Sequence, residues 1–134
     1  MAALFSDESP TLILGPQSRG ALLGALTAQS LGIGLVEMRK DPERATDSDA
    51  WRVGHTPPDY RDRTLRVGIR RGLIQSGDRV LLVDDVIDTG GQALAARALV
   101  DAAGAAWCGV AAVFDLLADP ALRYRLTVRS LLRE

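Results

Sequence analysis

Two adjacent carboxylates, Asp84 and Asp85, directly follow an apolar segment, residues 80–83. Continuous apolar runs of this kind are typical of strands whose two faces are both covered by helices. Ligands of open α/β sheets bind beside the carboxyl ends of the strands. The two acids are therefore placed to accept hydrogen bonds from sugar hydroxyls or to hold a divalent cation.

A second chemical feature follows, where residues 88–91 read Asp-Thr-Gly-Gly before an alanine-rich segment, residues 93–103. The two glycines allow a tight turn and a close approach of the backbone to a ligand. Unpaired N–H groups at a helix start, together with the positive end of its dipole, favour an anion. Carboxylates beside an anion cradle indicate a phosphorylated sugar. A plain helix cap beside solvated acids is the alternative, but the complete string favours a binding site.

Short apolar runs separated by glycines predict the elements that would carry this site. We expect strands over residues 11–14, 34–38, 79–83, 107–114 and 126–128, and helices over residues 21–31 and 93–103. Strands that alternate with helices predict an α/β fold, with an open, mainly parallel twisted sheet flanked by helices.

The length of 134 residues predicts a single domain over residues 1–134. Residues 37–71 hold nine of the 16 basic and seven of the 17 acidic residues, together with three prolines. We therefore expect a long mobile loop over about residues 41–64 that could exclude water from a site. A solvated surface excursion is the alternative interpretation.

Composition excludes several classes of protein. A hydrophobic fraction of 47% and a net charge of -1 exclude global disorder and give no support to general binding of nucleic acid or membranes. A single cysteine, Cys108, excludes an intramolecular disulfide and fits a reducing compartment. Because residues 1–10 contain acids and no basic residue, we expect no secretory signal and a cytoplasmic protein.

Residues 83–91, Val-Asp-Asp-Val-Ile-Asp-Thr-Gly-Gly, resemble the phosphoribosyl-pyrophosphate motif of the type I phosphoribosyltransferases. Residues 12–20 resemble the first strand and pyrophosphate loop of the adenine and purine members, and residues 35–40 resemble their second strand, which ends in Arg-Lys. The resemblance extends from about Thr11 to the end of the chain. It implies transfer of a phosphoribosyl group from phosphoribosyl pyrophosphate to a nucleobase, a purine by preference, with Mg²⁺ as cofactor and a homodimer as the assembly.

The resemblance also implies a role for each matching residue. Asp84 and Asp85 would hold the ribose hydroxyls, directly or through magnesium, and Asp88 would be a general base or hydrogen-bond partner of a purine. Arg19 and Lys40 would stabilise the departing pyrophosphate, which makes them catalytic together with Asp88. The full substrate-binding set is Ser18, Arg19, Arg39, Lys40, Asp84, Asp85, Asp88, Thr89, Gly90, Gly91 and Gln92.

The sequence departs from the family pattern at three places. Gln92 stands where a Thr or Ser is usual, and Gln17 replaces the usual acid of the pyrophosphate loop. The chain begins almost at its first core strand, so we expect the N-terminal hood over the base to be reduced or absent. These departures leave open a second function, a non-catalytic regulatory protein that binds phosphoribosyl pyrophosphate or a nucleotide.

A receiver-type signalling domain is a third candidate, because its first strand also ends in an acid pair. In such domains the pair lies near the N-terminus and a lysine follows well downstream. Here the pair lies at residues 84–85 and no lysine follows it, so we reject this interpretation. Among the remaining residues, we expect Cys108, Trp107 and Phe114 in the core, and Asp101 and Asp115 as surface or turn carboxylates.

Overall fold

The computed structural model describes residues 1–42 and 50–134, which form one mixed sheet in the order β3-β4-β2-β1-β5-β6-β7. Its strands are β1 (Leu12–Pro16), β2 (Gly34–Lys40), β3 (Trp51–His55), β4 (Arg66–Arg70), β5 (Arg79–Ile87), β6 (Ala106–Asp115) and β7 (Val128–Arg133). The helices are the 3₁₀ helix η1 (Ala2–Glu8) and the α-helices α1 (Arg19–Leu31), α2 (Gly91–Ala102) and α3 (Pro120–Leu126).

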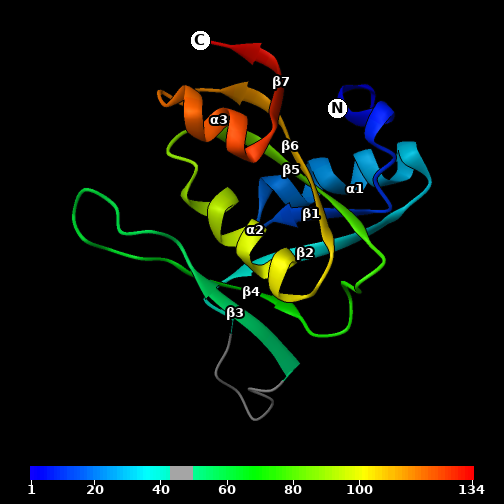
Figure 1. Cartoon of the computed structure of the whole chain (residues 1–134), viewed down its shortest axis with the longest axis horizontal. Coiled ribbons are helices and arrows are strands. Elements are labelled where there is room, and N and C mark those ends of the chain that lie inside the picture. Colours follow the sequence, from blue (N-terminus) through cyan, green and yellow to red (C-terminus); the bar gives the residue numbers. More distant parts are fainter. Residues whose placement is uncertain (43–49) are drawn as a thin grey trace.

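The open, mainly parallel sheet flanked by helices is confirmed. β1 pairs in parallel with both β2 and β5, and β6 pairs in parallel with both β5 and β7. In the described part of the chain, only β4 runs against the common strand direction, because it pairs antiparallel with both β2 and β3. Helices α2 and α3 lie in front of the sheet in Figure 1, and α1 lies behind it.

Burial of strand β5 on both faces explains why its apolar run is continuous. Val80 and Leu82 pack with Leu99 of α2 on one face of the sheet, while Leu81 and Val83 pack with neighbours that include Phe5 and Ala28 on the other. Successive side chains of a strand point to opposite faces, so a strand covered on both sides needs apolar residues at every position.

The expected loop over residues 41–64 is wrong for residues 51–55. These residues form β3, which pairs with β4 along the edge of the sheet, with Val53 opposite Gly68. The part of the predicted loop over residues 43–49 lies outside the described residues. The charged, proline-bearing composition concealed this edge strand, whose side chains are only partly buried.

The last predicted strand is also misplaced, because Leu126 ends α3 and β7 begins at Val128. The signals for α3 were present in the sequence. Asp119 caps this helix by accepting a hydrogen bond from the Ala121 amide at 2.9 Å, and Pro120 occupies its first turn.

Asp115 is not the surface or turn carboxylate that we expected. It is only 2% exposed, and its Oδ2 lies 2.5 Å from Nε of Arg123. Phe114, expected in the core, is 45% exposed near the end of β6. Cys108 is buried as predicted, and the half-buried Trp107 packs against the core.

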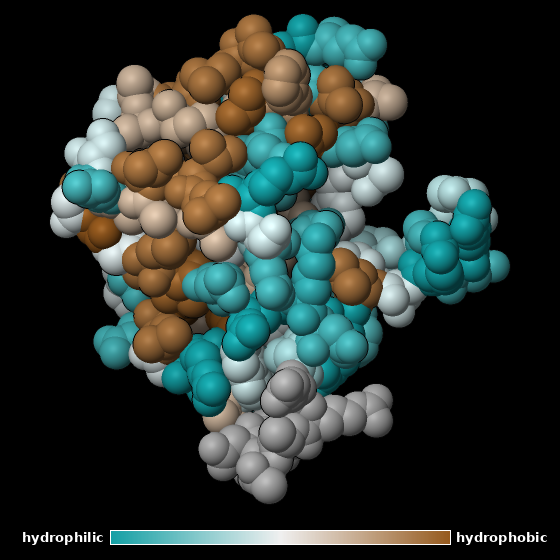
Figure 2. Space-filling view, turned by 180° about the vertical axis from the view of Figure 1, so that it is seen from behind, coloured by the Kyte–Doolittle hydropathy of each residue, from teal (hydrophilic) through white to brown (hydrophobic). Residues whose placement is uncertain are grey.

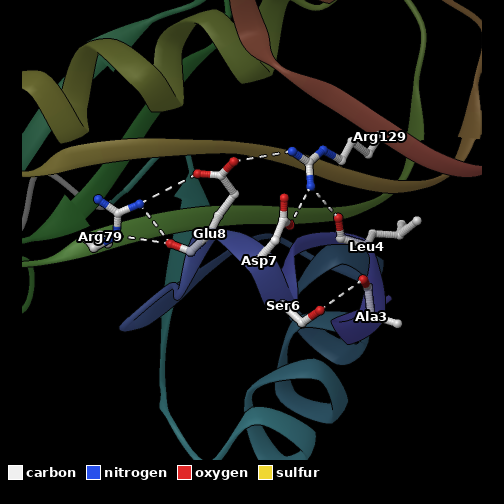
Figure 3. A network of polar contacts seen from close by, with 7 residues as sticks. All are labelled: Ala3, Leu4, Ser6, Asp7, Glu8, Arg79 and Arg129. Atoms are coloured by element: carbon white, nitrogen blue, oxygen red, sulfur yellow. Dashed lines mark hydrogen bonds and ion pairs between the residues drawn. The ribbon is translucent and has the colours of Figure 1, made fainter.

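A polar network fastens the N-terminal helix η1 to the sheet (Figure 3). Arg129 of β7 donates to the Leu4 carbonyl and to Asp7, both at 2.7 Å. Arg79 of β5 donates to the Glu8 carbonyl at 2.7 Å. Within the described ranges, no helix combines the length and the apolar character that crossing a membrane requires.

Candidate active site

The carboxyl ends of β1, β2 and β5 meet around one polar pocket. It is lined by Gln17, Ser18, Arg19, Gly20, Lys40, Asp84, Asp85, Val86, Asp88 and Gln92. Seven of the predicted site residues are therefore brought together, although they lie up to 74 positions apart in the sequence. The sheet topology explains why these residues lie together, because β1 lies between β2 and β5 and runs parallel to both, so the carboxyl ends of the three strands are adjacent.

A second cavity of about 140 Å³ adjoins this pocket at the start of α2. It is lined by residues 86–93 together with Leu82, Asp84 and Val110, and it contains the predicted Thr89, Gly90 and Gly91. Asp84, Val86, Asp88 and Gln92 line both spaces. A ligand that carries two separate anionic groups could therefore occupy both.

The turn before α2 is open rather than filled by protein. The Gly91 amide donates to Thr89 Oγ1 at 3.3 Å, and the Leu94 amide donates to the Gly90 carbonyl at 2.9 Å. Across residues 1–42 and 50–134, the amides of Gln92 and Ala93 have no hydrogen-bond acceptor. Free amides at a helix N-terminus bind phosphate, as the sequence predicted for this turn.

Gly90 holds the cradle in a conformation that a side chain would disturb. Its φ is 82°, in the left-handed region that favours glycine. A Cβ at this position would lie 2.8 Å from Leu122 Cδ2 and 3.3 Å from Leu117 Cδ2. The segment around α3 therefore packs directly under the anion cradle.

The two adjacent acids are in different electrostatic surroundings. Asp85 pairs with Arg19, with Oδ2 2.9 Å from Nε, whereas Asp84 accepts a hydrogen bond from the Asp85 amide at 2.8 Å. Burial raises the pKa of Asp84 to about 7, with a further increase from the Asp85 side chain. The Asp85 amide and the charge of Lys40 lower that pKa and so oppose the shift. A cation or hydroxyl donors beside Asp84 would lower this pKa and favour the charged carboxylate.

Arg39 is not brought into the pocket. Its Nε lies 3.4 Å from Oε1 of Glu37, whereas the next residue, Lys40, lines the pocket. The strand period of two explains the difference, since neighbouring residues at the end of β2 project to opposite faces.

The structure adds three residues of this pocket to the predicted set, Gln17, Gly20 and Val86. A Cβ on Gly20 would lie 2.8 Å from Asp84 Oδ1, so this glycine lets the loop approach the acid closely. Gly20 ends the loop motif seen in the sequence, which is the signal that could have identified it. A further groove is lined by residues 56–60 together with Thr89, Gly91 and Gln92, so this part of the predicted 41–64 loop lies beside the cradle.

A phosphoribosyl transferase domain model matches residues 1–132, so the chain belongs to this family. Among curated relatives, it is 35% identical over 116 residues to the adenine phosphoribosyltransferase of a Synechococcus species, covering 87% of this chain and 65% of the relative. It is 42% identical over 106 residues to that of a Nocardioides species, covering 78% and 54%. The chain thus spans less than two thirds of these relatives.

Solved structures agree with this assignment. The adenine phosphoribosyltransferase of Rhodothermus marinus matches with a TM-score of 0.80 at 31% identity, covering 97% of this chain and 73% of that one. The enzyme from Thermoanaerobacter pseudethanolicus matches with a TM-score of 0.87 at 26% identity, covering 99% and 76%.

Proposed function

We propose that this protein transfers a phosphoribosyl group from phosphoribosyl pyrophosphate to a purine base and releases pyrophosphate. One observation carries the proposal: an open anion cradle at the start of α2 shares Asp84, Asp88 and Gln92 with a pocket that Arg19 and Lys40 line. Phosphoribosyl pyrophosphate has this arrangement, a 5′-phosphate and a pyrophosphate joined by a ribose. The relatives' names favour adenine as the first base to test.

The roles of the residues follow from their positions. The cradle of residues 88–92 holds the 5′-phosphate, and Asp84 and Asp85 accept hydrogen bonds from the ribose hydroxyls. A ring nitrogen of the base forms a bond to C1 of the ribose. The C1–O bond breaks, and its electron pair leaves with the pyrophosphate. Arg19 and Lys40 stabilise the charge that develops on this leaving group. By the family resemblance, Asp88 hydrogen-bonds the base or accepts its proton.

The carboxylate pair fits the Mg²⁺ that this reaction class uses. Carboxylate oxygens together with substrate phosphates and water are the ligands that Mg²⁺ prefers, and both Asp84 and Asp85 line the pocket. Bound there, the cation would neutralise phosphate charge. Asp84 would release its proton on binding, since its pKa is raised to about 7.

An apolar surface on α1 supports a homodimer. Leu22 and Leu26, one helical turn apart, are 70% and 66% exposed. Figure 2 shows hydrophobic side chains gathered on the rear face of the molecule, the face on which α1 lies. We place the protein in the cytoplasm, where a purine-recycling reaction and a single reduced cysteine belong.

The test is an assay of nucleotide formation from phosphoribosyl pyrophosphate and Mg²⁺ with a panel of bases that includes adenine, hypoxanthine and guanine. We expect equal amounts of nucleotide and pyrophosphate with at least one purine. Tight binding of phosphoribosyl pyrophosphate without turnover on any base would instead indicate the regulatory function.

A further inference from the structure

Gln17 is joined to the second strand by two hydrogen bonds. Its backbone amide donates to the Met38 carbonyl at 2.8 Å, which continues the parallel pairing of β1 and β2. Its side-chain Oε1 accepts a hydrogen bond from the Lys40 amide at 3.0 Å. In a regular parallel ladder, the backbone carbonyl of residue 17 would accept that second bond. The side chain therefore replaces the backbone at the point where the chain leaves the sheet to form the loop over residues 17–20.

This hydrogen bond lies at the end of β2, where the lysine leaves the strand. Lys40 is the last residue of β2, and its charge lies close enough to Asp84 to lower the pKa of that acid. The lysine side chain is long and flexible, so its reach depends on a fixed backbone. Without Gln17 the Lys40 amide would lose its acceptor, whereas the other edge of this strand end stays paired with β4.

Gln17 supplies a hydrogen-bond acceptor without adding negative charge to the pocket. The pocket already contains three carboxylates, Asp84, Asp85 and Asp88, and two cationic side chains, Arg19 and Lys40. A carboxylate at residue 17 could accept the same hydrogen bond, but it would add negative charge where a pyrophosphate group must bind. An amide accepts the bond without this electrostatic cost.

We propose that Gln17 is a positioning residue that fixes Lys40 at the pyrophosphate end of the site while adding no negative charge to it. This inference rests on the proposed function, because it assigns that end of the pocket to pyrophosphate.

The test is a double-mutant cycle in the full chain, read as calorimetric affinity for pyrophosphate with excess Mg²⁺. Gln17→Met keeps the length of the side chain and removes the acceptor, so we expect the affinity to fall roughly tenfold. Lys40→Met should cause a similar loss. Because Gln17 acts through Lys40, the double variant should bind no more weakly than Lys40→Met alone. Gln75→Met, an exposed change in the turn between β4 and β5, is the matched control and should bind like the wild type.

Two further measurements separate positioning from a general loss of structure. Affinity for ribose 5-phosphate, which the cradle holds, should stay unchanged in Gln17→Met. Gln17→Glu keeps the hydrogen bond and adds a charge, so its deficit in pyrophosphate affinity should shrink as ionic strength rises.

The inference is overturned if Gln17→Met binds pyrophosphate like the control, if its loss adds fully to that of Lys40→Met, or if ribose 5-phosphate binding falls equally. Absence of pyrophosphate binding in the wild type would overturn it as well. A failure of the proposed function alone would give a different result. No base would be converted to a nucleotide, but Gln17→Met would still lower pyrophosphate affinity, and this loss would still disappear in the Lys40→Met background.

Discussion

The acid pair at the end of β5 shows how burial prepares a side chain for ligand binding. Asp85 pairs with Arg19, whereas partial burial raises the pKa of Asp84 to about 7. The pair therefore combines one carboxylate held by an arginine with one whose burial raises its pKa. Neither is needed for the core, which is formed by the apolar residues before them.

The first prediction concerns these acids. Asp84→Asn combined with Asp85→Asn should lower the affinity for phosphoribosyl pyrophosphate by roughly 100-fold or more, because hydrogen bonds to two carboxylates are lost. At pH 8 the Asp84→Asn change should not lower the Tm, because the amide replaces a partly buried negative charge. Asp101→Asn, an exposed change on α2, is the control. Unchanged affinity in the double variant would contradict the assigned site.

Most of the candidate site could be proposed from local sequence patterns, whereas its surroundings could not. The strand, the acid pair and the glycine turn are contiguous, so local patterns were enough to identify them. Arg39 could not be separated from Lys40 without knowing which face of β2 each side chain occupies. The burial of Asp115 depends on Arg123, which reaches it only after α3 folds back, and no local pattern reveals that contact.

At the scale of elements, α3 acts as a support for the anion cradle. Leu117 and Leu122 lie within contact distance of a Cβ built on Gly90. The Asp115–Arg123 ion pair closes the turn that carries both leucines, and the Leu117 amide also donates to Asp115 at 2.9 Å. The β6–α3 turn and the cradle are therefore one packed unit.

Gly90→Ala tests this packing. The left-handed φ and the overlap with Leu122 should lower the free energy of unfolding by about 2 kcal/mol and weaken binding of ribose 5-phosphate. Gly77→Ala is the matched control, because a Cβ at Gly77 meets nothing within 4 Å. Chemical denaturation of both variants measures the difference, and equal stability would show that the cradle tolerates a side chain.

Asp115→Asn tests the ion pair through its pH dependence. Burial alone would raise the pKa of Asp115, but hydrogen bonds from Arg123 and from the Leu117 amide bring it below the usual range. A lowered pKa means that the stabilisation is complete above the unfolded value, about 4, and is lost as the pH falls through the folded pKa. At pH 7 we expect the variant to have a Tm lower by on the order of 10 °C. This gap should narrow below pH 4; a gap independent of pH would exclude the charge as its cause.

At the scale of the whole molecule, the two faces of the sheet differ. One is covered by α2 and α3 beside the cradle, and the other by η1 and α1, whose outer side exposes Leu22 and Leu26. The mainly parallel fold was predictable because strands and helices alternate along most of the chain. The antiparallel edge was not, because β3 and β4 lie in a charged segment with no helix between them.

The homodimer proposal gives a prediction at this scale. Leu26→Glu places a charge in the apolar surface of α1, so the mass measured by light scattering should fall from that of two chains to that of one. Leu73→Glu, also at an exposed leucine (53%) but away from this helix, should leave the mass unchanged. A wild type that is already monomeric would exclude the proposed assembly.

The most direct measurement is calorimetric titration of the wild-type chain with phosphoribosyl pyrophosphate in the presence of Mg²⁺, repeated with ribose 5-phosphate as competitor. We predict one molecule bound per chain, displaced by the competitor and lost in Gly90→Ala. No binding, or binding that ribose 5-phosphate does not displace, would contradict the claim that the turn before α2 receives a sugar-bound phosphate.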